Sequence, residues 1–184
     1  MPVTDTDRHI IWTGVVVFNI FGLFGNLNVI YAHYRLKSLR SKYGILLTML
    51  VTAHTVCLLY ELALLELNIS GIPIRKNSCF YFLSPYIFTY CMQVSLMAAI
   101  STDMLFSIAA PLKHRMLRTR TYLALLIIPG IIYGIAAVSL GIFYATNTVI
   151  KLCNPPSSLP FEVKRIWHVI GLLFTAITIV SYVS

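Results

Sequence analysis

Long apolar segments alternate with short polar ones along the whole chain. Positions 9–34 hold no Asp, Glu, Lys or Arg, and the same is true of 121–150 and 166–184. Two further apolar stretches, 43–67 and 77–112, are interrupted only by Glu61 and Glu66 in the first and by Asp103 in the second. A helix needs about 20 mostly apolar residues to cross the hydrocarbon core of a bilayer. The pattern therefore predicts an all-α, polytopic membrane bundle in a single domain over 1–184, with five spans at about 10–34, 43–67, 80–110, 121–146 and 166–184.

Composition supports a membrane protein and excludes other classes. Hydrophobic residues make up 58% of the chain and charged residues 11%, whereas soluble domains carry about 25% charged residues. Disorder requires low hydrophobicity, which this chain lacks. The first apolar stretch is too long for a signal peptide, and Asp5 and Asp7 stand where a signal peptide has its basic segment. We therefore expect an uncleaved first span.

The net charge of +8 is unevenly distributed between the predicted loops. The loops after the first and third spans each carry four basic residues and no acidic one, namely Arg35, Lys37, Arg40 and Lys42, then Lys113, Arg115, Arg118 and Arg120. Basic short loops stay in the cytoplasm, so the N-terminus is predicted to be extracellular. Anionic lipid head groups are the expected partners of these loops, and no nucleic-acid partner is expected.

Three polar residues of the first two spans are candidates for helix packing or ligand binding. Asn26 and His54 are expected to form helix-packing hydrogen bonds, and His54 is a candidate partner of Asn26. Glu61 follows His54 by nearly two helical turns and therefore shares its helix face. Placing a charge inside a membrane costs at least ~2.5–3.5 kcal/mol, so an ionisable residue such as Glu61 in a span is a candidate for a functional role. Glu61 is thus expected either to line a ligand cavity or to reach the membrane interface.

The third span carries polar residues towards both of its ends. Tyr86, Tyr90 and Gln93 place polar tips on an apolar wall near the predicted outer end, as a small-ligand cavity requires, although interface anchoring also explains the tyrosines. Asp103 lies near the predicted cytoplasmic end. We expect it to pair with a nearby Arg or Lys, and breaking such a pair can bias two states of a helix bundle.

The cysteines divide into two predicted types. Cys79 and Cys153 lie at the predicted outer boundary, an oxidising compartment, so a disulfide between them is expected. Cys57 and Cys91 lie within spans and are expected to remain thiols. A glycosylation sequon begins at Asn68, at the very end of the second span, where we do not expect it to be used. No nucleophile–base set, metal-ligand cluster or phosphate loop is found, so neither an enzyme nor a cofactor is expected.

Several of these residues belong to an ordered series of short strings. The series comprises Gly25-Asn26-x-x-Val29, Leu39-Arg40-Ser41-Lys42, His54-Thr55-Val56-Cys57 with Glu61, Cys79-Phe80, Gln93, Asp103 with Leu105, Pro111-Leu112-Lys113-His114-Arg115 and Cys153-Asn154-Pro155-Pro156. It resembles the nematode serpentine chemoreceptor class SX of the rhodopsin-like G-protein-coupled receptor superfamily, from about Gly14 to Ser184.

The resemblance implies a chemosensory receptor in the plasma membrane of chemosensory neurons. An external small molecule would bind among Glu61, Tyr86, Tyr90 and Gln93, in a cavity lined by spans two, three and five. Asp103, with Lys113 and Arg115 of the following basic loop, would then transmit binding to a heterotrimeric G protein. The same resemblance makes Cys153 the expected partner of Cys79.

Departures from the superfamily pattern accompany the resemblance. Met104 follows Asp103 where most such receptors have Arg, His54 replaces an acidic residue, and the fourth span lacks its typical Trp. Because the complete architecture has seven helices, the chain is expected to be truncated after the fifth and deficient in signalling. The alternative is a non-signalling membrane protein that pairs with full-length receptors and alters their folding or trafficking. A transporter is disfavoured because no internal repeat is found.

Overall fold

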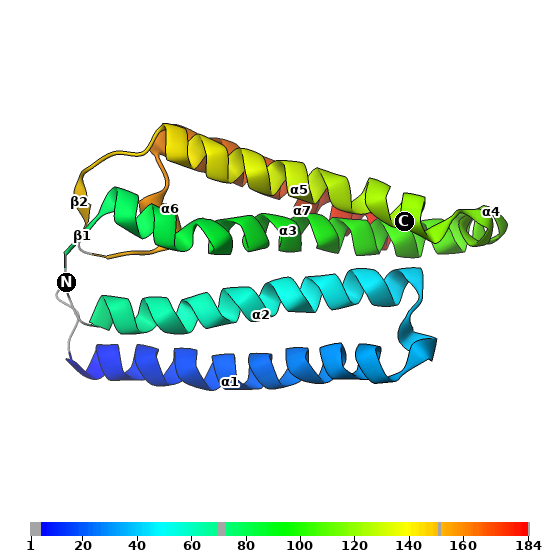
Figure 1. The fold of residues 1–184 in the computed structure, drawn as a ribbon, viewed down its shortest axis with the longest axis horizontal. Helices are drawn as coiled ribbons and strands as arrows, with labels where there is room; N and C mark the ends of the chain where they lie inside the picture. Colours follow the sequence, from blue (N-terminus) through cyan, green and yellow to red (C-terminus); the bar gives the residue numbers. More distant parts are fainter. Residues whose placement is uncertain (1–4, 70–72, 151, 184) are drawn as a thin grey trace.

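Five long helices form a bundle in which neighbours in sequence run in alternating directions (Figure 1). The computed structural model describes residues 5–69, 73–150 and 152–183, with side chains from Trp12 onward. In chain order the long helices are α1 Asp5–Arg35, α2 Lys42–Ile69, α3 Lys76–Ala109, α5 Thr119–Phe143 and α7 Phe161–Val183. Each contains a segment long and apolar enough to cross a membrane. The predicted all-α architecture with five spans is therefore confirmed.

The helix ends differ from the predicted span ends by a few residues because the absence of charge does not define a helix. α5 ends at Phe143, three residues before the predicted end of that span. Thr146, Asn147 and Thr148 are uncharged, but they follow the helix as irregular chain that leads into a strand. α3 begins at Lys76, before the apolar residues of its span. Helices thus extend into polar flanks and can also stop within an uncharged run.

Short elements that the hydropathy pattern did not indicate occupy the connections. They are the 3₁₀ helix η1 Lys37–Leu39, the strand β1 Ile74–Arg75, the helix α4 Pro111–Met116, the strand β2 Val149–Ile150 and the helix α6 Pro155–Ser158. β1 and β2 pair antiparallel, with Ile74 opposite Ile150. Proline at the first positions of α4 and α6 suits a helix start, because those backbone N–H groups have no partner within the helix.

The two ends of the bundle differ in the short elements that they carry. The disulfide end carries β1, β2 and α6, together with the bond between Cys79 and Cys153. The α4 end carries η1 and α4, which projects beyond the other helices in Figure 1. The long helices, with α3 at the centre, run between the two ends, so a displacement at one end can be communicated to the other.

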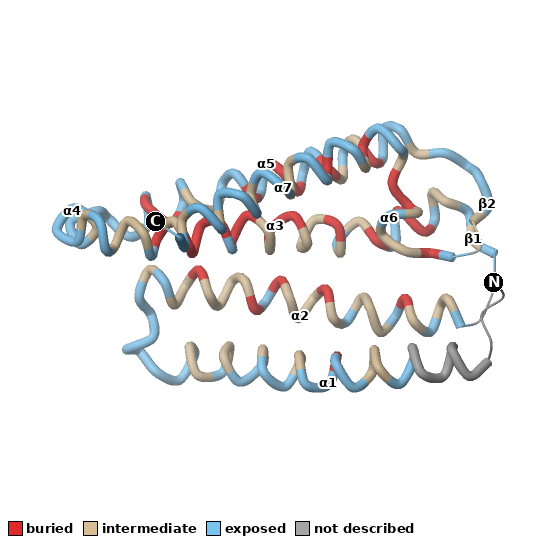
Figure 2. The backbone as a smooth tube through the Cα atoms, turned by 180° about the vertical axis from the view of Figure 1, so that it is seen from behind, coloured by how far each residue is buried: buried red, intermediate tan, exposed pale blue. Residues whose placement is uncertain are grey.

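α3 is the central helix of the bundle. It packs against α2, α5 and α7, and its buried positions recur along its whole length, as the red segments of Figure 2 show. Pro85 interrupts its hydrogen-bond ladder because proline has no backbone N–H. The Ser84 hydroxyl donates instead to the carbonyl oxygen of Tyr81, at 2.9 Å, so that this acceptor keeps a partner.

Glycines bring α5 close to α3. A Cβ atom added at Gly134 would lie 2.6 Å from the Phe88 ring, and one at Gly141 would lie 2.1 Å from the tip of the Phe80 ring. Small residues at helix interfaces permit this close approach, which gains van der Waals contact where the hydrophobic effect is absent. The positions recur at helical spacing, so they form one stripe along α5 that faces α3.

α1 packs mainly against α2 and leaves most of its apolar side chains exposed (Figure 2). A Cβ atom at Gly22 would lie 2.8 Å from Leu58, which places these two residues at the same level of the antiparallel pair. Exposed apolar side chains of this kind suit contact with lipid chains. Asn19 is the exception on α1, because it is buried.

Candidate functional site

The disulfide end is held together by a covalent bond and a side-chain clamp. Cys79 at the start of α3 is bonded to Cys153 in the connection between β2 and α6, which confirms the predicted disulfide. The Asn68 amide, at the end of α2, donates from Nδ2 to the Cys153 carbonyl oxygen and accepts from the Cys153 backbone N–H, both at 2.9 Å. The sequon's asparagine therefore binds the loop with its side-chain amide. Ser70, the third sequon residue, lies outside the described residues.

Below the disulfide end, a thiol joins α2 to α3. The Gln93 amide donates from Nε2 to Cys57 Sγ at 2.9 Å, and the same sulfur lies 3.2 Å from Thr89 Oγ1. Either the thiol or the Thr89 hydroxyl can donate in this contact, and the hydroxyl also lies within hydrogen-bond distance of backbone carbonyls of α3. Cys57 is thus a thiol as expected, but it acts as a polar connector and not only as an apolar residue.

Glu61 lies one helical turn from Cys57, on the same face of α2. Its carboxyl is next to the Asn19 side chain of α1 and close enough to Tyr86 of α3 to interact with it electrostatically. Glu61 therefore stands between α1 and α3. It is half-buried, whereas Glu66, one turn nearer to the disulfide end, is exposed.

An aromatic group continues the site from α3 to α7. Tyr86 and Tyr90 stack with ring centroids 6.4 Å apart, and Tyr90 packs on Trp167 at 4.9 Å. The Trp167 indole N–H donates to Cys91 Sγ at 3.3 Å, and the Tyr133 hydroxyl donates to the Trp167 carbonyl oxygen at 2.6 Å. The candidate ligand residues Glu61, Tyr86, Tyr90 and Gln93 are thus brought to one region, on α2 and α3, that extends to α7.

A cavity of about 340 Å³ adjoins this region on the side of the α4 end. Its walls are mostly apolar residues of α2 and α3, with Thr89 at the boundary with the thiol connector. Glu61, Tyr86, Tyr90 and Gln93 do not line it. The predicted ligand residues and this cavity are therefore neighbouring but separate features.

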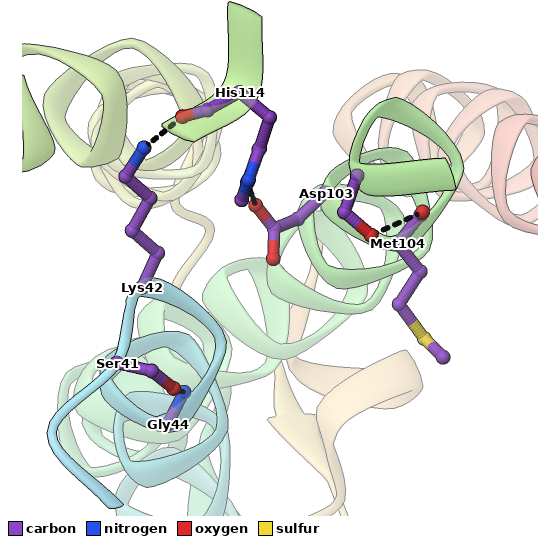
Figure 3. Close-up of polar contacts among 7 residues, drawn as sticks. Ser41, Lys42, Gly44, Asp103, Met104 and His114 are labelled. Carbon is purple, nitrogen blue, oxygen red and sulfur yellow. Dashed lines mark hydrogen bonds and ion pairs between the residues drawn. The ribbon is translucent and has the colours of Figure 1, made fainter. Parts of the chain in front are cut away.

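At the α4 end, Asp103 is paired with His114 (Figure 3). His114 Nε2 lies 2.8 Å from Asp103 Oδ1, and Asp103 is only 3% exposed. Sequence reasoning expected an Arg or Lys partner, and the structure places a histidine there instead. The pairing depends on α4, which turns back after Pro111 so that His114 reaches the end of α3.

Aromatic rings and one lysine surround this pair. The His114 ring contacts the rings of Phe106 and Tyr122, with centroids 5.7 Å and 5.4 Å away. Lys42, at the start of α2, donates to the His114 carbonyl oxygen (Figure 3). Its Nζ also lies 5.0 Å from the centre of the Tyr122 ring. The α4-end cluster, defined as Lys42, Asp103, Phe106, His114 and Tyr122, therefore connects α2, α3, α4 and α5.

The start of α2 is shaped so that Lys42 can reach this cluster. The Ser41 hydroxyl accepts from the Gly44 backbone N–H at 3.1 Å, which caps the helix (Figure 3). A Cβ atom at Gly44 would lie 1.8 Å from the Leu39 carbonyl oxygen, so the tight entry requires glycine. Lys42 thus points into the protein, unlike the expectation that this loop's basic residues face lipid. Lys113 and Arg115 of α4 are exposed.

Asn26 and His54 lie at the same level of α1 and α2. This follows from the contact of Gly22 with Leu58, because one turn further along α1 and one turn back along α2 reaches the two residues. No hydrogen bond joins their side chains within the described part of the chain. Their role in helix packing therefore stays a prediction.

Four residues of these clusters were missed as functional candidates by sequence reasoning: Asn19, Lys42, His114 and Trp167. Asn19 and Trp167 look like ordinary members of apolar runs, and no spacing distinguishes them. His114 stands in the Lys113-His114-Arg115 string, but its partner depends on the fold of α4. Within the described residues, no group of three or more His, Cys, Asp or Glu side chains is placed to hold a metal ion.

Comparison with known proteins identifies the family. A family model described as serpentine type 7TM GPCR chemoreceptor Srsx matches residues 19–184. No match is found among curated proteins. The matched range includes all of α2 to α7 and the second half of α1, and with them both the disulfide and the α4-end cluster. The chain belongs to the Srsx family of serpentine seven-transmembrane GPCR chemoreceptors.

Proposed function

We propose that the chain detects an external small molecule at its disulfide end and transmits binding to a heterotrimeric G protein at its α4 end. The supporting observation is that α2 and α3 both connect two polar clusters otherwise separated by apolar packing. One cluster contains Glu61, Tyr86 and Gln93, and the other is the Asp103–His114 pair. A ligand acts only by binding one of two bundle states more tightly, and the α4-end cluster offers contacts that can differ between them.

The proposed orientation places the disulfide end outside the plasma membrane of a chemosensory neuron. An oxidising compartment favours the bond between Cys79 and Cys153. The basic residues of η1 and α4 then lie on the cytoplasmic side, as the distribution of positive charge favours. Epitope tags test this directly: a tag before Thr4 should be labelled on intact cells, and a tag inserted at Ser38 should be labelled only after permeabilisation.

Ligand detection is tested with the whole chain in lipid nanodiscs. Thermal unfolding is measured against a library of small molecules, because a ligand at 100 times its Kd stabilises the folded state by about 2.7 kcal/mol. Nucleotide exchange by an added heterotrimeric G protein is then measured with each compound that binds. We expect at least one compound to stabilise the chain and to accelerate exchange.

The two parts of the proposal can fail separately. A compound that binds without accelerating exchange would support detection and refute signalling by this chain. If no compound binds, ligand detection is refuted. Asp103→Asn is the informative variant, because it should change exchange and, by shifting the balance between the two bundle states, should also change the apparent affinity of the compound.

A further inference from the structure

Glu61 is a carboxyl group inside a membrane-spanning helix without a cationic partner. It lies about two turns before the end of α2 at Ile69, and no Lys, Arg or His of the described residues forms an ion pair with it. Even a half-buried carboxylate within a membrane span is costly unless it is paired, because the surrounding medium solvates charge poorly. Glu66 is exposed near the helix end and has no such constraint. The Glu61 carboxylate therefore has no positively charged partner among the described residues.

Asn19 adds a second acceptor without a donor at the same place. Its Nδ2 donates to the Val15 carbonyl oxygen at 2.9 Å, which sets the orientation of the amide. Its Oδ1 is buried and has no hydrogen-bond partner, and the residue is only 2% exposed. The Asn19 amide is also hydrogen-bonded to Glu61, so its unpartnered Oδ1 lies beside that carboxyl group. A group with several N–H donors would reach the amide oxygen and the carboxylate together.

An aromatic wall borders the carboxyl group on the side of α3. Tyr86 lies close to Glu61, and its ring stacks on that of Tyr90 at an angle of 17°. The electron-rich faces of aromatic rings attract cations and also cover apolar groups. A carboxylate within electrostatic reach of Tyr86, whose ring stacks on Tyr90, therefore suits an organic cation better than a neutral molecule or an inorganic ion.

We propose that the small molecule is an organic amine, whose ammonium group donates to the Glu61 carboxylate and to Asn19 Oδ1 while its apolar part lies against Tyr86 and Tyr90. This assignment rests on the proposed function, since it names the chemical class of that ligand. The ammonium group provides the missing positive charge, and the tyrosine rings select for an attached hydrocarbon. Gln93 and Cys57 lie further from the disulfide end and are already hydrogen-bonded to each other, so they are not assigned to the ammonium group.

The test uses the whole chain in nanodiscs and pairs of compounds that differ only in charge. Each pair joins an amine to the alcohol of the same skeleton, from butylamine and butanol to phenethylamine and 2-phenylethanol. We expect at least one amine to raise the Tm and its alcohol to leave it unchanged. Replacing Na⁺ by K⁺ at constant ionic strength should have no effect.

Two sets of variants locate the binding. Glu61→Gln should weaken the amine by about 30-fold or more, because removing one member of a buried charge pair costs at least about 2 kcal/mol. The matched control Glu66→Gln should bind as the parent does. Tyr86→Leu should weaken binding by about 3-fold, whereas Tyr86→Phe should not, because it keeps the ring. The tyrosine variants also provide a test if Glu61→Gln does not fold.

The outcomes separate this inference from the proposed function. If alcohols or other neutral compounds bind as well as the amines, or binding is indifferent to Glu61→Gln and to Tyr86→Leu, the chain still detects a small molecule but the amine assignment is overturned. If the Tm instead depends on the presence of Na⁺, the group bound at Glu61 is an inorganic ion, and the amine assignment is likewise overturned. If neither series nor the wider library binds, the proposed function itself fails.

Discussion

The pairing of Asp103 with His114 makes a quantitative prediction about the stability of the α4 end. The substitution His114→Phe keeps a ring against Phe106 and Tyr122 but removes the nitrogen that lies 2.8 Å from the Asp103 carboxylate. The carboxylate would then remain buried without its partner. The variant therefore isolates the polar contact from the aromatic packing around it.

The expected loss is about 3 kcal/mol. Removing the partner of a buried carboxylate costs roughly 3–5 kcal/mol, because the carboxylate charge is left unpaired in a poorly solvating environment. The lower value applies here because the His114 side chain is 19% exposed and that of Asp103 is 4% exposed, so water reaches one side of the pair. The double variant Asp103→Leu with His114→Phe should recover most of the loss, since replacing both partners by apolar groups is often nearly neutral.

The free energy of unfolding is measured in mixed micelles with increasing denaturing detergent, for the parent, both single variants and the double variant. Arg115→Ala is the matched control, because it lies on the same short helix but is exposed, and it should change stability by less than about 0.5 kcal/mol. The reasoning is refuted if His114→Phe costs no more than the control. It is also refuted if the two single losses simply add in the double variant, because that result would mean that the residues do not interact.

Three further predictions concern packing and the disulfide end. Gly134→Ala should destabilise the chain by about 1–3 kcal/mol through overpacking against the facing phenylalanine ring. The control Gly25→Ala should not destabilise the chain, because its added Cβ would meet nothing within 4 Å. Equal losses of stability for the two variants in detergent unfolding would contradict this prediction. The disulfide between Cys79 and Cys153 closes a loop with a sequence separation of 74. Its reduction should lower the stability of the chain by up to about 4 kcal/mol, and an unchanged Tm after reduction would contradict this prediction. Asn68 should stay unglycosylated in a secretory membrane because its amide binds the Cys153 backbone, so glycosidase treatment should not change the electrophoretic mobility of the chain.

Hydropathy could predict the number and approximate position of the helices for a simple physical reason. A bilayer forces each spanning segment to satisfy its backbone hydrogen bonds internally, so a sufficiently long apolar run becomes a helix whatever its neighbours are. The disulfide could also be predicted, because Cys79 and Cys153 lie beside membrane boundaries on the same side. These features depend on the solvent that surrounds each segment and not on detailed packing.

The contacts within the two clusters depend on packing and could not be read from hydropathy. α4 and β1–β2 are too short to give a periodic signal, and the Asp103–His114 pair exists only because α4 turns back on α3. Asn19 differs from other polar residues in spans only through its position opposite Glu61, which requires the register of α1 against α2. Cys57 likewise becomes a connector only because Gln93 of another helix reaches it.

The attachment of α3 at one end has a mechanical consequence. Its first turn is tied by the disulfide, and α2 is tied to the same loop by Asn68. With 34 residues at 1.5 Å each, α3 is a lever about 50 Å long whose pivot lies at the tied end. A tilt of only 5° about this pivot would move the opposite end by about 4 Å, comparable to the rise of one helical turn. Side chains near the pivot would hardly move, so a small tilt there is amplified into a larger displacement of Asp103 relative to Lys42 of α2.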